Sequence, residues 1–303
     1  MRFYVGVTDQ DWYSQLSDLG YDEVNFWKPG SAPFKALKEN DLFLFKLHAP
    51  QNYIVGGGFF VRFSTIPVSL AWQAFGKKNG VENCDEFNRR IMKYRQRNGI
   101  TSGNLQIGCI ILTEPFFFEQ QDWIPVPEDW SKSIVQGKSY DTDTQIGLTL
   151  YRKVTEHMAV SSRIAESVDE VRYAESVTKH RLGQGAFRVA VTDAYQRRCA
   201  ISGEKTLPVL QAAHIRPYAE QGPHNVTNGL LLRSDIHTLY DGGYITITPD
   251  YHIEVSSRLH DEYGNGKDYY KYHGRQLIIL PENIRERPDK EFLSWHNEHI
   301  YLG

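Results

Sequence analysis

The stretch from residue 207 to residue 247, LPVLQAAHIRPYAEQGPHNVTNGLLLRSDIHTLYDGGYITI, decides the fold of the C-terminal part of this chain. An apolar run ends at His214, a polar loop follows, and Asn228 opens a second apolar run. Short apolar runs bounded by loop residues predict two strands. Ser234 then predicts the start of a short helix, which a Gly-Gly pair ends. The stretch therefore predicts a ββα unit.

Polar residues recur at defined places on this frame. His237 and Asp241 are four residues apart, so they share one face of the predicted helix and can hold one cation between them. His214 ends the first strand, where its ring can face the helix. Two other interpretations stay open. The histidines can be ordinary core residues, or a structural zinc site can use Cys199, His214, His237 and Asp241.

The order His, Asn, His on a ββα frame resembles the HNH endonuclease family. The segments QAAHIRP and NGLLLRSDIHTLYDGG, with RLGQGAFR and RCAISG upstream, resemble HNH domains of restriction-type nucleases over approximately residues 180–260. The resemblance implies that His214 is the general base and that Asn228 fixes the loop between the strands. It also implies that His237 is a metal ligand, with Asp241 as a second ligand.

The metal site departs from the family in one position. Many HNH nucleases carry an acidic residue or a histidine immediately before the base, whereas this chain has Ala213. Gln211 is expected on the face of the strand opposite His214, because side chains alternate along a strand. Two protein ligands then remain, and an imidazole with a carboxylate and open water positions suits Mg²⁺ or Mn²⁺. We expect DNA phosphate to complete the shell of a weakly held ion.

Arginines flank the motif and can contact phosphates. The expected phosphate-binding residues are Arg188, Arg216 and Arg233.

The whole chain has the pattern of an α+β protein. Residues 1–140 predict a mixed β barrel with helices, and residues 181–303 contain the ββα motif. Residues 141–180 predict a helical connector that packs against a domain, since its apolar residues are spaced by four. That stripe consists of Ile146, Leu150, Val154 and Met158.

The N-terminal segments FYVGVT, NFWKPG, FKALKENDLFLFKLHAP and IVGGGFF resemble the PUA-like superfamily, including its EVE and ASCH relatives. The resemblance implies a domain that reads a modified base, which is flipped into an aromatic pocket. Asn25, Phe26 and Trp27 are expected in a turn that supplies stacking and hydrogen bonds. The further expected pocket residues are Tyr4, Phe34, His48 and Trp72.

Composition limits the alternatives. The net charge of −3 argues against bulk electrostatic coating of nucleic acid, so binding must use local patches. The three cysteines form no C-x-x-C pair, which excludes a disulfide framework and a four-thiolate zinc site. No long apolar span or signal peptide is visible, so we expect a cytoplasmic protein without a membrane partner.

The resemblance to HNH endonucleases implies a metal-dependent DNA endonuclease. The resemblances imply a modification-dependent restriction enzyme that reads a flipped cytosine, for example 5-methylcytosine or 5-hydroxymethylcytosine, in double-stranded DNA and serves in phage defence. A homodimer is expected, because two strands must be cut and each HNH site cuts one. The alternatives are an HNH restriction or nicking enzyme that reads unmodified sequence, and a non-catalytic reader of nucleic acid.

Overall fold

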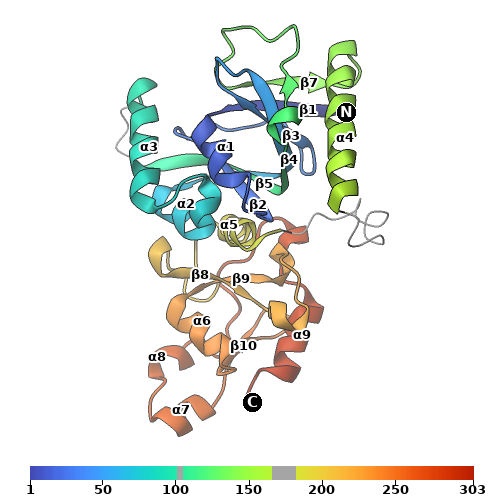
Figure 1. The fold of residues 1–303 in the computed structure, drawn as a ribbon. Helices are drawn as coiled ribbons and strands as arrows, with labels where there is room; N and C mark the ends of the chain where they lie inside the picture. Colours follow the sequence, from blue (N-terminus) through green and yellow to red (C-terminus); the bar gives the residue numbers. More distant parts are fainter. Residues whose placement is uncertain (101–104, 166–181) are drawn as a thin grey trace. The chain divides into compact units, whose positions relative to one another are not determined.

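The computed structural model describes residues 1–100, 105–165 and 182–303. The chain divides into two compact units, Met1–His180 and Arg181–Gly303, each with its own core. The mixture of helices and sheets in both units confirms the predicted α+β class (Figure 1). In the described part of the chain, no helix is long and apolar enough to cross a membrane.

The N-terminal unit is built on one mixed sheet with the strand order β2-β5-β4-β3-β1-β7, and β6 pairs with β4. Only β1 and β3 pair in parallel among the described strands. β4 is long and its register against β5 shifts twice, which lets it bend and pair with three strands. No pairing joins β2 to β7 among the described strands, so these two strands end the mixed sheet. The strands are β1 (Arg2–Thr8), β2 (Glu23–Lys28), β3 (Leu42–Leu47), β4 (Tyr53–Pro67), β5 (Gln106–Phe117), β6 (Ile124–Pro125) and β7 (Gly137–Asp141).

The residues Asn25, Phe26 and Trp27 lie in strand β2, so the expectation of a turn is wrong. β2 pairs antiparallel with β5, and Phe26 lies opposite Ile110 in the register. The turn signals Pro29 and Gly30 follow the strand rather than interrupt it. Because aromatic and β-branched residues favour a half-buried pleated surface, this segment continues the sheet up to that turn.

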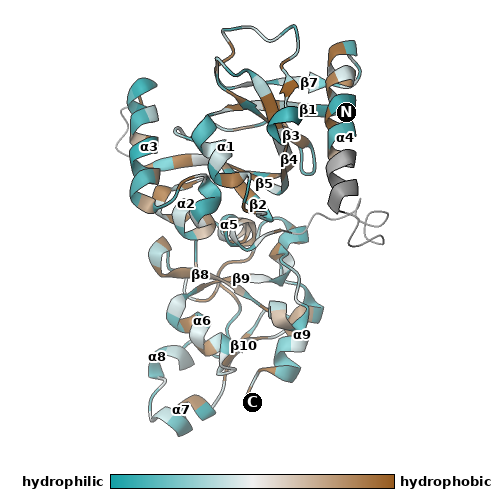
Figure 2. Cartoon of the chain, viewed as in Figure 1, coloured by the Kyte–Doolittle hydropathy of each residue, from teal (hydrophilic) through white to brown (hydrophobic). Residues whose placement is uncertain are grey.

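Helices cover this sheet. They are α1 (Gln10–Leu16), α2 (Val68–Phe75), α3 (Cys84–Arg97) and α4 (Gln145–Ala165). Asp9 caps α1 by accepting the Trp12 N–H, and Asn83 caps α3 by accepting the Glu86 N–H. In Figure 2 the strands β4 and β5 carry hydrophobic residues where these elements pack.

Helix α4 packs on the N-terminal unit by part of the predicted apolar stripe. Leu150 and Val154 are buried beside Phe3 and Tyr140, and Met158 is partly buried against the same cluster. Ile146 is 39% exposed and lies outside the contact. The middle of the predicted stripe is therefore buried in the core of this unit, whereas its first residue is not.

The C-terminal unit contains the predicted ββα arrangement. Strand β8 (Leu210–His214) pairs antiparallel with β9 (Gly229–Arg233), and helix α6 (Ser234–Asp241) follows directly. Gly229 lies opposite His214, and a Cβ atom there would approach Val191 Cγ2 to 2.4 Å. Glycine is therefore required where β9 crosses α5. The other elements are α5 (Gln184–Ala194), β10 (Ile245–Ile247), β11 (Ile253–Val255), α7 (Arg258–Tyr263), α8 (Lys267–Tyr270) and α9 (Lys290–His299).

A buried histidine joins α9 to the rest of the C-terminal core. His296 is 2% exposed, and its ring stacks on Tyr240 with 3.8 Å between ring centroids. Its Nε2 faces the Tyr240 carbonyl, so this nitrogen donates, and Nδ1 accepts from the Thr246 hydroxyl at 2.9 Å. Burial lowers the pKa of His296 to about 4, because the charged ring would lose its hydration.

This pKa predicts a pH-dependent stability. The unfolded chain binds a proton at position 296 as the pH falls below about 6.5, whereas the folded chain binds it only near pH 4. Between pH 7 and pH 4, the free energy of unfolding of the wild type should therefore fall by roughly 3 kcal/mol more than that of His296→Gln. Calorimetric unfolding of both proteins across this range measures the difference. Parallel pH curves would contradict the assignment.

Candidate functional site

His214 ends strand β8 in a partly enclosed environment. Its ring stacks on Phe187 of α5, with 4.0 Å between the centroids and 12° between the planes. Burial first, and then the nearby His224 and His237, lower the pKa of His214 to about 4. The imidazole is consequently neutral at pH 7, which is the form that accepts a proton.

A second histidine contacts the first. His224 Nδ1 lies 3.0 Å from His214 Nε2, and the ring of Tyr218 stacks on His224 with 4.8 Å between centroids. The sequence assigned no role to His224. It lies in an irregular loop, so no periodic spacing relates it to His214, and only the folded loop brings the two rings together.

Asn228 fixes the loop between the two strands. Its side chain is fully buried at 0% exposure. Its Nδ2 donates to the carbonyls of Arg216 and Pro223, at 2.9 and 3.0 Å, and its Oδ1 accepts from the Arg216 N–H at 2.9 Å. One amide therefore satisfies three backbone groups that turn away from the β8–β9 ladder.

His237 and Asp241 meet on one face of α6, as their spacing predicts. His237 Nε2 lies 3.2 Å from Asp241 Oδ2, and the carboxylate side chain is 61% exposed. Gln211 Oε1 lies 2.7 Å from His237 Nδ1, a contact that the sequence did not predict. β8 is a short strand, and the long amide side chain of Gln211 reaches helix α6 from it.

The arrangement fits a divalent cation. With the Gln211 oxygen as acceptor, Nδ1 of His237 carries the hydrogen and Nε2 turns its lone pair toward Asp241. Two electron-pair donors this close require a proton or a cation between them. A histidine that binds a metal usually donates its other ring N–H to an acceptor that orients the ring, and the Gln211 oxygen is in the place of that acceptor here.

A structural zinc site is not assembled from the described residues. They contain no group of three or more His, Cys, Asp or Glu side chains that could hold a metal ion. Cys199 is buried, and its sulfur accepts the backbone N–H groups of Ser202 and Arg233. A site with two protein ligands, His237 and Asp241, is the arrangement that the geometry offers.

The three flanking arginines have different environments. Arg233 forms a bidentate pair with Asp235, with both N–O distances at 2.6 Å. Arg216 donates to the Glu220 carbonyl at 2.6 Å and lies over the ring of Trp295. Arg188 is half-buried in α5, and burial lowers its pKa. A phosphate would have to compete with existing partners at Arg216 and Arg233.

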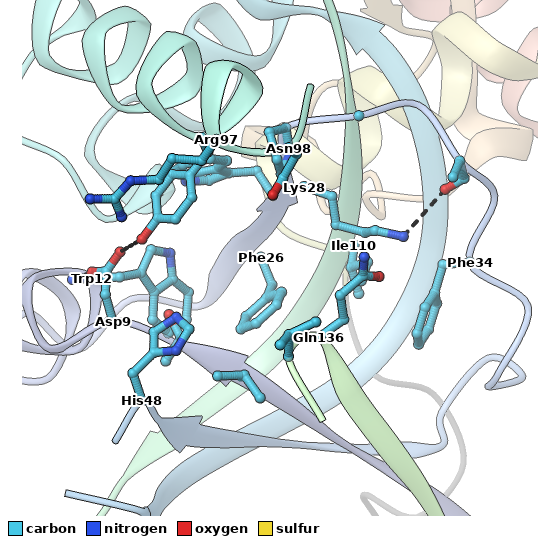
Figure 3. A pocket seen from close by; sticks show the side chains of 18 of the residues that line it. Asp9, Trp12, Phe26, Lys28, Phe34, His48, Arg97, Asn98, Ile110 and Gln136 are labelled. Atoms are coloured by element: carbon cyan, nitrogen blue, oxygen red, sulfur yellow. Dashed lines mark hydrogen bonds between the residues drawn. The ribbon is translucent and has the colours of Figure 1, made fainter. Parts of the chain in front are cut away.

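The N-terminal unit contains a cavity of about 520 Å³ with aromatic walls (Figure 3). Five of the seven residues expected in a base pocket line it, and they come from β1, β2 and the loops after β2 and β3. These five residues are Tyr4, Phe26, Trp27, Phe34 and His48.

The other two expected residues do not line this cavity. The Asn25 side chain is buried and donates from Nδ2 to Asn79 Oδ1 at 2.8 Å. Trp72 lies on α2, where its ring packs against Phe87. Asn25 belongs to strand β2 and Trp72 to helix α2, and neither contributes to the cavity lining.

Polar residues that the sequence did not single out also line the cavity. Figure 3 shows Asp9 on the side of Trp12 and His48, and Lys28 with Asn98 along another wall. Asp9 Oδ2 accepts from the Tyr94 hydroxyl at 3.0 Å. Burial and Asp9 together raise the pKa of Tyr94 to about 12, so the hydroxyl keeps its proton.

A basic stripe on α3 leads to this cavity. Arg89, Lys93 and Arg97 are spaced by four and exposed, so they share one face of the helix. Arg97 also lines the cavity. A polyanion bound along this face would have its backbone beside the cavity wall.

Comparison with known proteins identifies part of the chain. Among solved structures, an ASCH protein from Zymomonas mobilis has 7% identity and a TM-score of 0.35, covering 52% of this chain and 96% of its own. A structure titled modification dependent TagI restriction endonuclease has 13% identity and a TM-score of 0.30, covering 97% and 81%. A search of curated proteins found no match. Residues 199–248 match the family model described as HNH endonuclease. The chain therefore carries an HNH endonuclease domain and is an enzyme of the nuclease class.

Proposed function

We propose that this protein is a divalent-metal-dependent DNA endonuclease whose N-terminal unit reads a modified base. One observation carries the nuclease chemistry. A neutral imidazole, His214, and a ligand pair, His237 with Asp241, lie on the same ββα frame in a domain that matches the HNH family.

In this proposal His214 accepts a proton from a water molecule, whose oxygen attacks the phosphorus of the scissile phosphodiester. Asn228 holds the loop that follows His214, so the ring keeps its position while the bond is cut. His237 and Asp241 would hold Mg²⁺ or Mn²⁺, which supplies charge stabilisation at the scissile phosphate. Gln211 orients the His237 ring by accepting a hydrogen bond from its Nδ1, the nitrogen that faces away from Asp241.

The aromatic cavity supports a base-reading role for the N-terminal unit. Its volume of about 520 Å³ lies within the range of small-ligand sites, and its walls offer ring faces for stacking. Flipping a base out of duplex DNA costs a few kcal/mol, which stacking and edge hydrogen bonds can offset. The basic face of α3 beside the cavity suits the DNA backbone.

The wider role follows from these two parts. We infer that the substrate is double-stranded DNA with a modified cytosine, 5-methylcytosine or 5-hydroxymethylcytosine, and that the enzyme acts in the cytoplasm in defence against phage. Because one HNH site cuts one strand, two copies of the chain are needed for a double-strand break. A homodimer is the simplest assembly that meets this need.

The nuclease assignment predicts that His214→Ala and His237→Ala each lower the rate of DNA cleavage by roughly 100-fold or more. The reason is that the first removes the base and the second removes a metal ligand. Cleavage of supercoiled plasmid in Mg²⁺ or Mn²⁺ measures both effects. His260→Ala, an exposed histidine on α7, is the matched control and should cleave like the wild type. Wild-type rates in His214→Ala would exclude this residue as the base.

The base-reading assignment predicts selectivity among four matched DNAs that are unmodified, 5-methylated, 5-hydroxymethylated or glucosylated at cytosine. Only a modified DNA should be cleaved efficiently. Phe34→Ala should reduce its advantage over unmodified DNA by roughly 5- to 100-fold, because a stacking face is lost. Tyr53→Ala, outside the cavity, is the control.

The same experiment separates the alternatives. Equal cleavage of all four DNAs would retain the nuclease and remove the modified-base reader, and discrete fragments of unmodified DNA would indicate sequence recognition. DNA binding without cleavage in either metal would indicate a non-catalytic reader.

A further inference from the structure

We propose that His224 is a positioning residue that accepts a hydrogen bond from Nε2 of His214 and so leaves Nδ1 of His214 as the atom that takes the proton from water. The proposal rests on the proposed function, in which His214 is the base. It assigns a role to a histidine outside the His-Asn-His order.

The loop is built to hold His224 at this distance. Asn228 bonds the carbonyl of Pro223, the residue immediately before His224, and both the N–H and the carbonyl of Arg216. A Cβ atom at Gly222 would approach the Arg216 carbonyl oxygen to 1.9 Å, so the loop closes tightly there. The anchors at 216 and 223 fix the chain on both sides of the turn. His224 therefore meets His214 through backbone that has little freedom to move.

The His214 ring is held on its face as well as at its edge. Phe187 stacks on the face, with 4.0 Å between the centroids. His224 meets the ring at 66°, with 5.0 Å between centroids and 3.0 Å between Nε2 and Nδ1. A ring flip would have to break the nitrogen–nitrogen hydrogen bond within this stack. The two contacts together define which nitrogen of His214 faces His224.

The direction of this bond decides whether His214 can be a base. A neutral imidazole carries one hydrogen and one lone pair. If His224 donated, the His214 lone pair on Nε2 would be occupied and its Nδ1 would carry the hydrogen, so no basic nitrogen would remain. If His214 donates from Nε2, its Nδ1 has the free lone pair. His224 then accepts on Nδ1 and carries its own hydrogen on Nε2.

The same bond stabilises the product of the proton transfer. The proton moves from water to His214 Nδ1 as the water oxygen bonds to phosphorus, and the P–O3′ bond breaks. The leaving 3′ oxygen takes a proton from solvent, and His214 returns its Nδ1 proton to solvent, so one water is consumed. While His214 is an imidazolium, its Nε2–H still donates to His224, and this charge-assisted bond is stronger than the neutral one.

The test uses the full chain and two substitutions of His224. Asn at this position can present its Oδ1 near the place of Nδ1, so His224→Asn retains an acceptor. His224→Leu fills similar space without one, and His260→Leu is the matched control on exposed α7. We expect single-turnover cleavage to fall by roughly 100-fold or more in His224→Leu and to be largely retained in His224→Asn, with DNA affinity unchanged in both.

Nitrogen-15 NMR of histidine-labelled protein without DNA supplies a readout that does not depend on cleavage. We expect the Nε2–H tautomer for His214 in the wild type and in His224→Asn, and a mixture of tautomers in His224→Leu. An Nδ1–H tautomer in the wild type would overturn the inference, as would cleavage by His224→Leu within threefold of wild type. Undiminished cleavage by His214→Ala would instead overturn the proposed base, whatever tautomer NMR reports.

Discussion

The three hydrogen bonds of the Asn228 amide are the constraint on which the C-terminal site depends. They satisfy backbone groups of Arg216 and Pro223 that the two-stranded ladder leaves unpaired. A buried amide with partners on both of its polar atoms is stable, whereas an apolar substitute would leave three backbone groups without partners. Since the loop between β8 and β9 begins next to His214 and contains His224, the same amide determines the position of both rings.

Helix periodicity and strand alternation differ in how well they predict this site. The four-residue spacing of His237 and Asp241 places both on one face of α6, and the structure shows them 3.2 Å apart. Alternation along β8 separates Gln211 from His214 but does not indicate that the Gln211 amide contacts His237. Spacing on a helix predicts which side chains share a face, but alternation along a strand does not predict which neighbouring element a long side chain will contact.

The N-terminal cavity shows which residues of a site can be predicted from sequence when only tertiary structure brings them together. The resemblance to PUA-like domains implied seven pocket residues, and five of them, among them Tyr4 and Phe34, line the cavity. The strand position of Asn25 depends on pairing with β5, more than 80 residues later in the chain, which local signals cannot show. Asp9 and Lys28 were missed for a related reason, since charged residues near element ends usually face solvent.

The enclosure of His214 and the small number of metal ligands both make the HNH domain depend on a bound DNA phosphate in the proposed mechanism. Enclosure keeps His214 neutral, so it can accept a proton at pH 7, and the same enclosure disfavours the imidazolium that results. The proposed ligand pair, His237 and Asp241, offers one imidazole and one exposed carboxylate, fewer donors than a divalent ion requires. A scissile phosphate answers both needs in the proposed mechanism, because its negative charge favours the imidazolium and its oxygens supply the missing ligands. In this mechanism the base and the metal site would be fully active only when a DNA phosphate lies in the site.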